Sequence, residues 1–253
     1  MMKNIINDHN WEELSKSFLN SKPFNYVVID NFFNEDFAMN IFESMPDYSQ
    51  VDVNYNNVAE KKKLSDNWHR FPKSIYTAFF NLVSTKFVES MRVLTQQEEL
   101  EADYGLHGGG VHMHKTGDYL NVHLDYDIHP KVPMQRKLNI IIYMTPEWKE
   151  EWGGHIELWS HNAEENQPKE CIQKFAPLFN RAIIFDTTQN SWHGVGVSQP
   201  LIPPVGVFRK SLAAYYVVPT DHTVGRNRAL FMPRPEQKED NSVMEFCLQR
   251  AGL

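Results

Sequence analysis

The pattern of hydrophobic and polar positions changes near residue 104. In the first part, apolar residues recur at helical spacing, which predicts a helix from the N-cap Asn34 to Pro46. A longer helix is predicted from about Ser74, with an apolar stripe formed by Ile75, Phe79, Leu82, Val83, Phe87 and Met91. Residues 26–30 form a short β-rich run, and Thr95-Gln-Gln-Glu98 resembles a capping box that opens a further short helix. Residues 47–73 are polar, so we expect them to be irregular, with Lys61-Lys62-Lys63 in a solvated loop.

After residue 104, short β-rich runs alternate with turn signals. The pattern predicts strands near residues 119–125, 138–144, 155–159, 171–175, 182–185, 193–197 and 210–218. So many short strands favour a barrel or jelly roll. We therefore expect an α+β chain with a mainly β core, folded as one domain over residues 1–253. Its parts are a helical buttress with an early strand (1–103), the β core (104–220) and an extension (221–253) with a last helix near 243–250.

Bulk properties narrow the class of protein. A length of 253 residues suits one large domain, and a net charge of −7 argues against general nucleic-acid binding, which needs a basic surface. The two cysteines, Cys171 and Cys247, are far apart, which favours a reducing, cytoplasmic compartment. The N-terminus shows no apolar signal segment, and the longest apolar stretch, 138–144, is too short to span a bilayer, so no membrane contact is expected.

One constellation suggests chemistry: His123-Leu124-Asp125, followed by His193 and then Arg209. Alternate residues of a strand point to the same face, so His123 and Asp125 can reach one metal ion. With His193 they would complete two imidazoles and one carboxylate, the three-point facial set that binds Fe(II) and leaves coordination positions open. The alternative for the tripeptide alone is a strand-edge histidine bonded to a nearby carboxylate.

Other polar pairs compete with this set. His155-Ile-Glu157 has the same spacing, but no arginine or second histidine stands in a comparable relation to it, so polar side chains on a barrel strand explain it better. His112 and His114 share a face without a carboxylate, which favours pocket-wall or surface histidines. Asp127 falls beyond the expected strand end, where we expect a solvated carboxylate.

Zinc is the main competing metal, because two histidines and a carboxylate also form hydrolytic zinc sites. No His-Glu-x-x-His helix is present to support that use. Arg209 favours a different role: its apolar flanks indicate burial, and a buried guanidinium needs an anion, for which a carboxylate is the natural bidentate partner. Ser211 faces the same side of the strand and can add a hydroxyl. A surface salt bridge is the alternative for Arg209.

The chain from about residue 112 to 218 resembles the Fe(II)- and 2-oxoglutarate-dependent dioxygenases, particularly the prolyl 4-hydroxylase-like branch. The resemblance is carried by residues 119–125, 136–148, 152–159, 180–186, 192–195 and 209–212. It implies a double-stranded β-helix, cupin-like, that holds Fe(II) through His123, Asp125 and His193. It also implies 2-oxoglutarate on the iron, with its distal carboxylate bound by Arg209, Ser211 and the Tyr143 hydroxyl.

The family resemblance further implies the reaction: O₂ and 2-oxoglutarate are consumed, succinate and CO₂ are released, and an unactivated C–H bond is hydroxylated. Ascorbate as a reductant is compatible with it. Asp125 argues against the halogenase variant, and an AlkB-like nucleic-acid demethylase is disfavoured because the chain is acidic and lacks a second arginine at that branch's spacing. Residues 198–205 resemble an insertion, expected to bulge at the barrel mouth.

Three functions stay open. Peptidyl proline leads as substrate, a free amino acid or other small molecule is the alternative, and a cupin-like metal- or ligand-binding barrel without turnover comes from another class. Arg209 and Ser211 discriminate, because a simple binding barrel has no need of them. The oligomeric state is left open by the sequence.

Overall fold

A computed structural model of the chain describes residues 5–220 and 225–252. The start of the expected buttress (1–4) and parts of the expected extension (221–224 and 253) lie outside the described residues. The α-helices found are α1 (Trp11–Asn20), α2 (Glu35–Ser44), α3 (Lys73–Leu82), α4 (Thr85–Thr95) and α5 (Asn241–Ala251). Short 3-10 helices lie at η1 (Tyr48–Gln50), η2 (Trp68–Arg70), η3 (Glu150–Trp152) and η4 (Pro235–Gln237). Within the described ranges, no helix has both the length and the apolar character needed to span a membrane.

The helix predicted after Asn34 is confirmed as α2. The Asn34 side chain accepts a hydrogen bond from the backbone N–H of Phe37 at 3.4 Å, so it caps the first turn. Expected helix 243–250 is likewise present as α5, where the Asp240 side chain accepts from the N–H groups of Ser242 and Val243.

The single long helix expected from Ser74 is wrong: it is two helices, α3 and α4. Ser84 separates them and accepts a hydrogen bond from the N–H of Phe87 at 3.3 Å, as the N-cap of α4. The apolar stripe continues across this break because both helices bury it in one hydrophobic cluster. Periodicity alone therefore did not reveal the change of direction.

The capping box expected at Thr95 is also wrong. Thr95 is the last residue of α4, and its buried hydroxyl donates to the carbonyl of Met91 at 2.7 Å within the helix. Gln96 follows with a φ of 56°, in the left-handed region that ends helices. The hydroxyl is thus used inside the preceding helix instead of opening a new one.

All seven strands expected after residue 104 are present. The complete set is β1 (Tyr26–Ile29), β2 (Val53–Asn56), β3 (Glu60–Ser65), β4 (Glu101–Ala102), β5 (Gly110–His114), β6 (Tyr119–Leu124), β7 (Met134–Tyr143), β8 (Ile156–Asn162), β9 (Gln167–Phe175), β10 (Ala182–Asp186), β11 (His193–Val195), β12 (Arg209–Pro219) and β13 (Leu230–Phe231). Every pairing between them is antiparallel.

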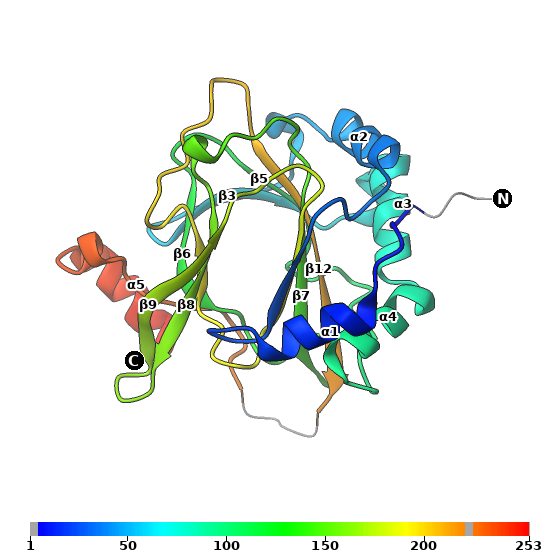
Figure 1. Cartoon of the computed structure of the whole chain (residues 1–253). Helices are drawn as coiled ribbons and strands as arrows, with labels where there is room; N and C mark the ends of the chain where they lie inside the picture. The colour runs from blue at the N-terminus through cyan, green and yellow to red at the C-terminus, as the bar shows by residue number, and fades with distance from the viewer. Residues whose placement is uncertain (1–4, 221–224, 253) are drawn as a thin grey trace.

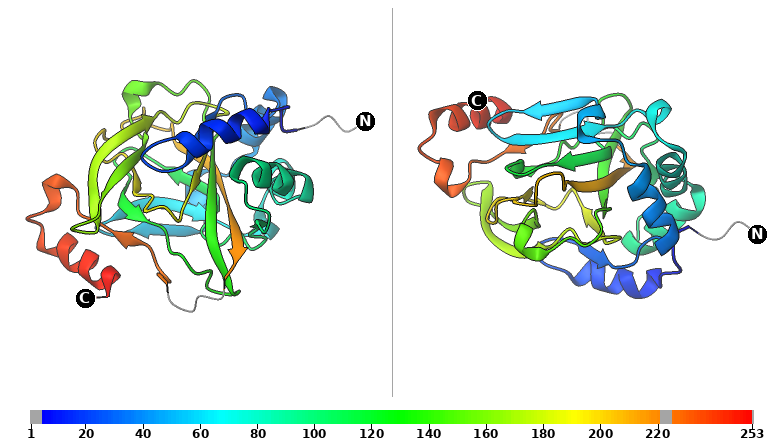
Figure 2. Two further views of the ribbon diagram at one scale, coloured as in Figure 1. Left: turned by 60° about the horizontal axis from the view of Figure 1, so that its bottom comes forward. Right: turned by 90° about the horizontal axis from the view of Figure 1, so that it is seen from above.

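The strands form one curled sheet in the order β1-β10-β7-β12-β5-β3-β6-β11-β8-β9. Its two arms face each other, with α2, α3 and α4 outside the β7 and β12 arm and α5 outside the β6 arm (Figures 1 and 2). This is the expected jelly-roll arrangement, buttressed by helices from the first part of the chain.

Strand β3 lies in the stretch that was expected to be irregular, so that expectation is wrong. It pairs with β5 through Lys63, Leu64 and Ser65, and with β6 through Glu60 and Lys61. It therefore joins the two arms, and the lysine run is part of a strand. Lys62 points inward with a side chain only 13% exposed, 3.4 Å from the Glu60 carboxylate.

Alternation along β7 separates two cores. Leu138, Ile140 and Ile142 are buried against the helices, whereas Ile141 and Tyr143 pack in the cluster between the two arms. Because successive side chains of a strand point to opposite faces, the same strand supports the helical layer and lines the barrel interior.

Candidate active site

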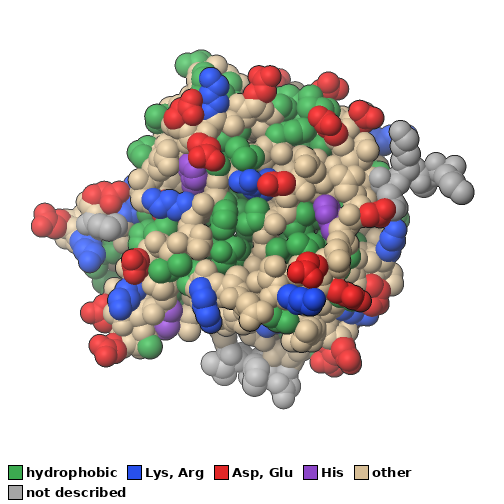
Figure 3. Space-filling model, viewed as in Figure 1, with side chains coloured by type: hydrophobic (Ala, Val, Ile, Leu, Met, Phe, Trp, Pro, Cys, Tyr) green, Lys and Arg blue, Asp and Glu red, His purple; other side chains and the backbone are tan. Residues whose placement is uncertain are grey.

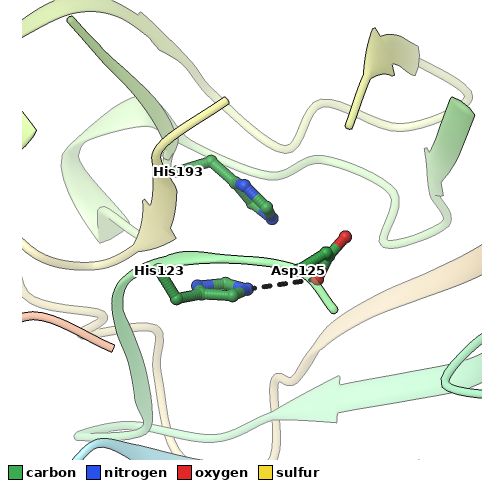
Figure 4. A group of neighbouring side chains, drawn as sticks. All are labelled: His123, Asp125 and His193. Atoms are coloured by element: carbon green, nitrogen blue, oxygen red, sulfur yellow. Dashed lines mark ion pairs between the residues drawn. The ribbon is translucent and has the colours of Figure 1, made fainter. Parts of the chain in front are cut away.

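His123, Asp125 and His193 come together at the inner face of the sheet. His193 begins β11 and is paired directly with His123 on β6, and Asp125 follows the end of β6 (Figure 4). All three side chains are buried, and their ligand atoms lie within 4.8 Å of one another. The His123 Nε2 atom is 3.6 Å from Oδ1 of Asp125. Among the described residues this is the one such group that could hold a metal ion.

The outer nitrogens of both histidines are held by backbone carbonyls. Nδ1 of His123 lies 2.9 Å from the oxygen of Asn121, and Nδ1 of His193 lies 2.8 Å from the oxygen of Ser191. A carbonyl only accepts, so Nδ1 carries the proton in each ring and Nε2 presents its lone pair. This tautomer is the one that an imidazole needs to bind a metal through Nε2.

The ionisation states of the group also suit a cation. Burial and the neighbouring His123 lower the pKa of His193 to about 4, so this ring is neutral at neutral pH. Burial acts to raise the pKa of Asp125, but the interactions with His123, His193 and Arg136 hold it below its usual range. Its Oδ2 atom is buried without a hydrogen-bond partner. Imidazole nitrogens and an ionised carboxylate with an unused oxygen are donors that Fe(II) accepts.

Arg209, Ser211 and Tyr143 form a second group in the same region. Ser211 is paired with Tyr143 on one side and with His112 on the other. Arg209 is 2% exposed, its Nε donates to the carbonyl of Gly154 at 2.9 Å, and its guanidinium carbon lies 4.7 Å from the centre of the Tyr143 ring.

Arg209 lacks a counter-ion. It takes part in none of the ion pairs found among the described residues, and its Nη2 atom has no hydrogen-bond partner. The buried hydroxyl of Tyr143 is likewise unpartnered. Because a buried, uncompensated charge is costly, this end of the site is suited to an anion.

A cavity of about 330 Å³ connects the two groups. It is lined by His123, Asp125 and His193 and also by Arg209 and Ser211. His112 and His114 line it as well, in agreement with the expected pocket-wall role; burial lowers the pKa of His112 to about 3 and that of His114 well below its usual value. Neither histidine joins the metal-binding group.

The rival pair is used structurally. The fully buried Glu157 carboxylate accepts hydrogen bonds from the backbone N–H and hydroxyl of Ser198 and from Nε1 of Trp159. These hydrogen bonds from Ser198 to Glu157 therefore join the segment after β11 to β8. Residues 198–205 form neither helix nor strand, as expected of a loop, and they contribute no residue to the cavity wall; their place at the barrel mouth stays a prediction.

Asp127 was expected to be solvated, and this is wrong. Its carboxylate pairs with the Arg226 guanidinium and accepts from the Arg226 backbone N–H at 3.1 Å. Arg226 Nε also reaches the carbonyl of Asp125 at 3.3 Å. The sequence could not reveal this pairing, because the two residues are 99 positions apart.

Several cavity residues were not predicted from the sequence as site residues, among them Lys62, Arg136 and Phe231. Phe231 pairs with His123 across β13 and β6, and its ring stacks on the imidazole at 5.1 Å. The Arg136 guanidinium lies between the rings of Tyr126 and Tyr215, 3.5 Å from each centre. The alternation of side chains along β3 could have predicted that Lys62 points inward. The two-residue strand β13 is too short to show such a pattern for Phe231.

Part of the chain is similar to known proteins. The sequence model of the 2OG-Fe(II) oxygenase superfamily matches residues 109–217. The mouse (Mus musculus) prolyl 3-hydroxylase OGFOD1 is 30% identical over 60 residues, which are 24% of this chain and 11% of that protein.

Solved structures share the fold. A prolyl-4-hydroxylase from Pseudomonas putida superposes with a TM-score of 0.54 at 12% identity, over 82% of this chain and 99% of the other. A prolyl hydroxylase from Trichoplax adhaerens, solved with a hypoxia inducible factor peptide fragment, gives 0.50 at 17% identity, over 83% and 94%. The expected double-stranded β-helix is thereby confirmed, and residues 109–217 are similar to the 2OG-Fe(II) oxygenase superfamily.

Proposed function

We propose that this oxygenase binds Fe(II) through His123, Asp125 and His193 and hydroxylates an unactivated C–H bond at the expense of 2-oxoglutarate and O₂. The observation that carries the proposal is Arg209. A buried guanidinium without a counter-ion shares one cavity with a metal-binding group, and a 2-oxoglutarate molecule offers both a metal-chelating end and a distal carboxylate. A binding barrel without turnover does not require that second end.

Each residue group has a defined task in this proposal. The two Nε2 lone pairs and the Asp125 carboxylate would hold the metal, with Nδ1 of each histidine fixed by its carbonyl. Nη2 of Arg209 would bind the distal carboxylate together with the Ser211 and Tyr143 hydroxyls. Bound Fe(II) would activate O₂, which is the oxidant: one oxygen atom would enter succinate as 2-oxoglutarate loses CO₂, and the other would enter the hydroxylated substrate.

The chain also provides for the exclusion of water. Ile141, Ile156 and Val195 line the cavity, and the Phe231 ring stacks on His123. An apolar wall around a reactive centre limits side reactions with water.

The substrate is the less determined part of the proposal. We infer peptidyl proline, supported by the prolyl hydroxylases named among the similar proteins and by the peptide bound in the Trichoplax structure. A free amino acid or another small molecule is the second candidate, because a cavity of about 330 Å³ also suits a compact substrate. A reducing, cytoplasmic setting stays part of the proposal.

Two measurements test the proposal. Anaerobic addition of Fe(II) and 2-oxoglutarate should give a visible metal-to-ligand charge-transfer band, whereas its absence in folded, metal-loaded protein would overturn the reading. Under air, succinate release and a mass gain of 16 should then be screened over proline peptides and small molecules. A gain confined to one set assigns the substrate class.

A further inference from the structure

The cavity carries an excess of positive charge. Five cationic side chains line it, namely Lys62, Arg136, Arg209, Arg228 and Arg250, against two carboxylates, Glu60 and Asp125. The chain as a whole has a net charge of −7, and the face in Figure 3 shows acidic and basic side chains interspersed. The excess of three positive charges is therefore local to the cavity.

The proposed cofactors do not remove this excess. Fe(II) brings two positive charges and 2-oxoglutarate brings two negative ones, so together they leave the balance unchanged. Lys62 already pairs with Glu60, Asp125 belongs to the metal group, and Arg209 is assigned to 2-oxoglutarate. The unmatched cations are Arg136, Arg228 and Arg250.

None of these three arginines has a carboxylate partner among the described residues. Arg136 is 2% exposed, and its Nε atom is buried without a hydrogen-bond partner. Arg228 donates through Nη2 to the backbone carbonyl of Gln249 at 2.8 Å. The Arg250 guanidinium carbon lies 5.2 Å and 5.9 Å from the ring centres of Phe246 and Phe231.

Arg228 and Arg250 both come from the C-terminal extension, which is fixed to the metal-binding strand. Leu230 and Phe231 pair with β6, and the Arg226–Asp127 ion pair anchors the same segment two residues beyond Asp125. On its other side Phe231 packs with α5, through Val243 and Cys247. Arg228 thus precedes β13, which pairs with the strand of His123, and Arg250 lies on α5, which packs against β13. Such preorganisation lowers the entropic cost of binding.

We propose that the C-terminal extension selects the primary substrate, with Arg228 and Arg250 binding a carboxylate near the C–H bond that is oxidised. This rests on the function proposed above and adds to it the chemical class of the substrate. The carboxylate has two sources with the same chemistry: an acidic side chain that flanks the reacting residue of a peptide, or the carboxylate of a small acid. Charge-assisted guanidinium–carboxylate bonds serve both.

Equilibrium binding tests the proposal without relying on turnover. The protein is kept anaerobic with Fe(II) and saturating 2-oxoglutarate, so that Arg209 is occupied. One arm uses rhodamine-labelled seven-residue peptides centred on proline, with glutamate or with glutamine at the flanking positions, followed by fluorescence anisotropy. The other arm uses N-acetylglutamate and N-acetylglutamine, followed by calorimetry.

The variant is Arg228→Gln/Arg250→Gln. Its matched control is Lys16→Gln/Lys169→Gln, which removes the same charge from two exposed positions that do not line the cavity. In wild type and control, the charged member of at least one arm should bind about tenfold tighter than its amide, and the double arginine variant should lose most of that difference. Raising the salt concentration should shrink the preference, because rim charges are screened.

Preference in the peptide arm alone assigns an acidic peptide, and preference in the small-acid arm alone assigns a small acid. Equal binding of charged and neutral members, absence of binding in both arms, or a preference that survives in the arginine variant overturns the proposal. Failure of the proposed function is seen separately, as a wild-type protein that does not bind 2-oxoglutarate in its own titration.

Discussion

Replacement of Arg209 by methionine should separate ligand affinity from stability. Methionine has similar length, so it fills the space of the 2% exposed side chain while it removes the charge and the unpartnered Nη2 atom. Loss of one buried charge-assisted pair typically costs about 2–5 kcal/mol. At about 1.4 kcal/mol for each tenfold change, the Kd for 2-oxoglutarate should rise by about 30-fold to about 4,000-fold.

Without ligand, the same substitution should not lower the stability of the protein. Burial lowers the pKa of Arg209, which shows that its surroundings disfavour the charge when no anion is bound. The free energy of unfolding of Arg209→Met without ligand should therefore equal or exceed that of the wild type. Lysine at this position keeps the charge but loses the bidentate fork, so Arg209→Lys should have an intermediate affinity.

Calorimetric titration with 2-oxoglutarate and thermal unfolding with and without it measure both effects. At a ligand concentration of 100 times Kd the wild type should gain about 2.7 kcal/mol, and Arg209→Met should gain little at that concentration. An unchanged Kd in Arg209→Met would mean that another residue anchors the distal carboxylate. A large loss of ligand-free stability would mean that Arg209 is primarily structural.

Three further predictions concern the metal group and its surroundings. Asp125→Ala should abolish Fe(II)-dependent succinate formation and weaken Fe(II) binding in a metal titration, and wild-type turnover in this variant would refute the ligand role. Phe231→Ala should lower the free energy of unfolding by about 3 kcal/mol, because a 3% exposed ring is lost, and should also weaken Fe(II) binding by releasing His123; denaturant unfolding and metal titration that both match the wild type would contradict this. Burial lowers the pKa of His112 from 6.5 to about 3, so the unfolded chain binds a proton at this residue between those values and the folded chain does not. The free energy of unfolding should therefore fall as the pH drops below about 6.5, and it should fall less in His112→Gln. Urea unfolding at pH 7 and pH 5 measures this fall, and an equal fall in wild type and variant would exclude the contribution of His112.

The sequence was informative wherever one residue type has one main use. Asn34 capped the predicted helix, and all seven short strands after residue 104 were placed within a few positions. The spacing of His123 and Asp125 predicted that both point to one face, because alternation along a strand is local geometry.

It misled wherever the partner of a residue is distant. Lys61-Lys62-Lys63 looked like a solvated loop, but pairing with β5 and β6 makes that segment the strand that joins the two arms of the sheet. Asp127 looked solvated until Arg226 was placed beside it. At Thr95, a hydroxyl that could cap a new helix was used inside the old one.

The sequence by itself thus determined the donor types, their order and the strand-rich core that carries them, since these follow from residue chemistry and local periodicity. Only the tertiary structure decided that Arg209 has no counter-ion among the described residues, that backbone carbonyls face Nδ1 of both imidazoles, and that the C-terminal extension lies against β6, which carries His123. Those features depend on contacts between residues far apart in the chain, and burial changes their energies because an unpaired charge that is harmless in water is costly inside a cavity.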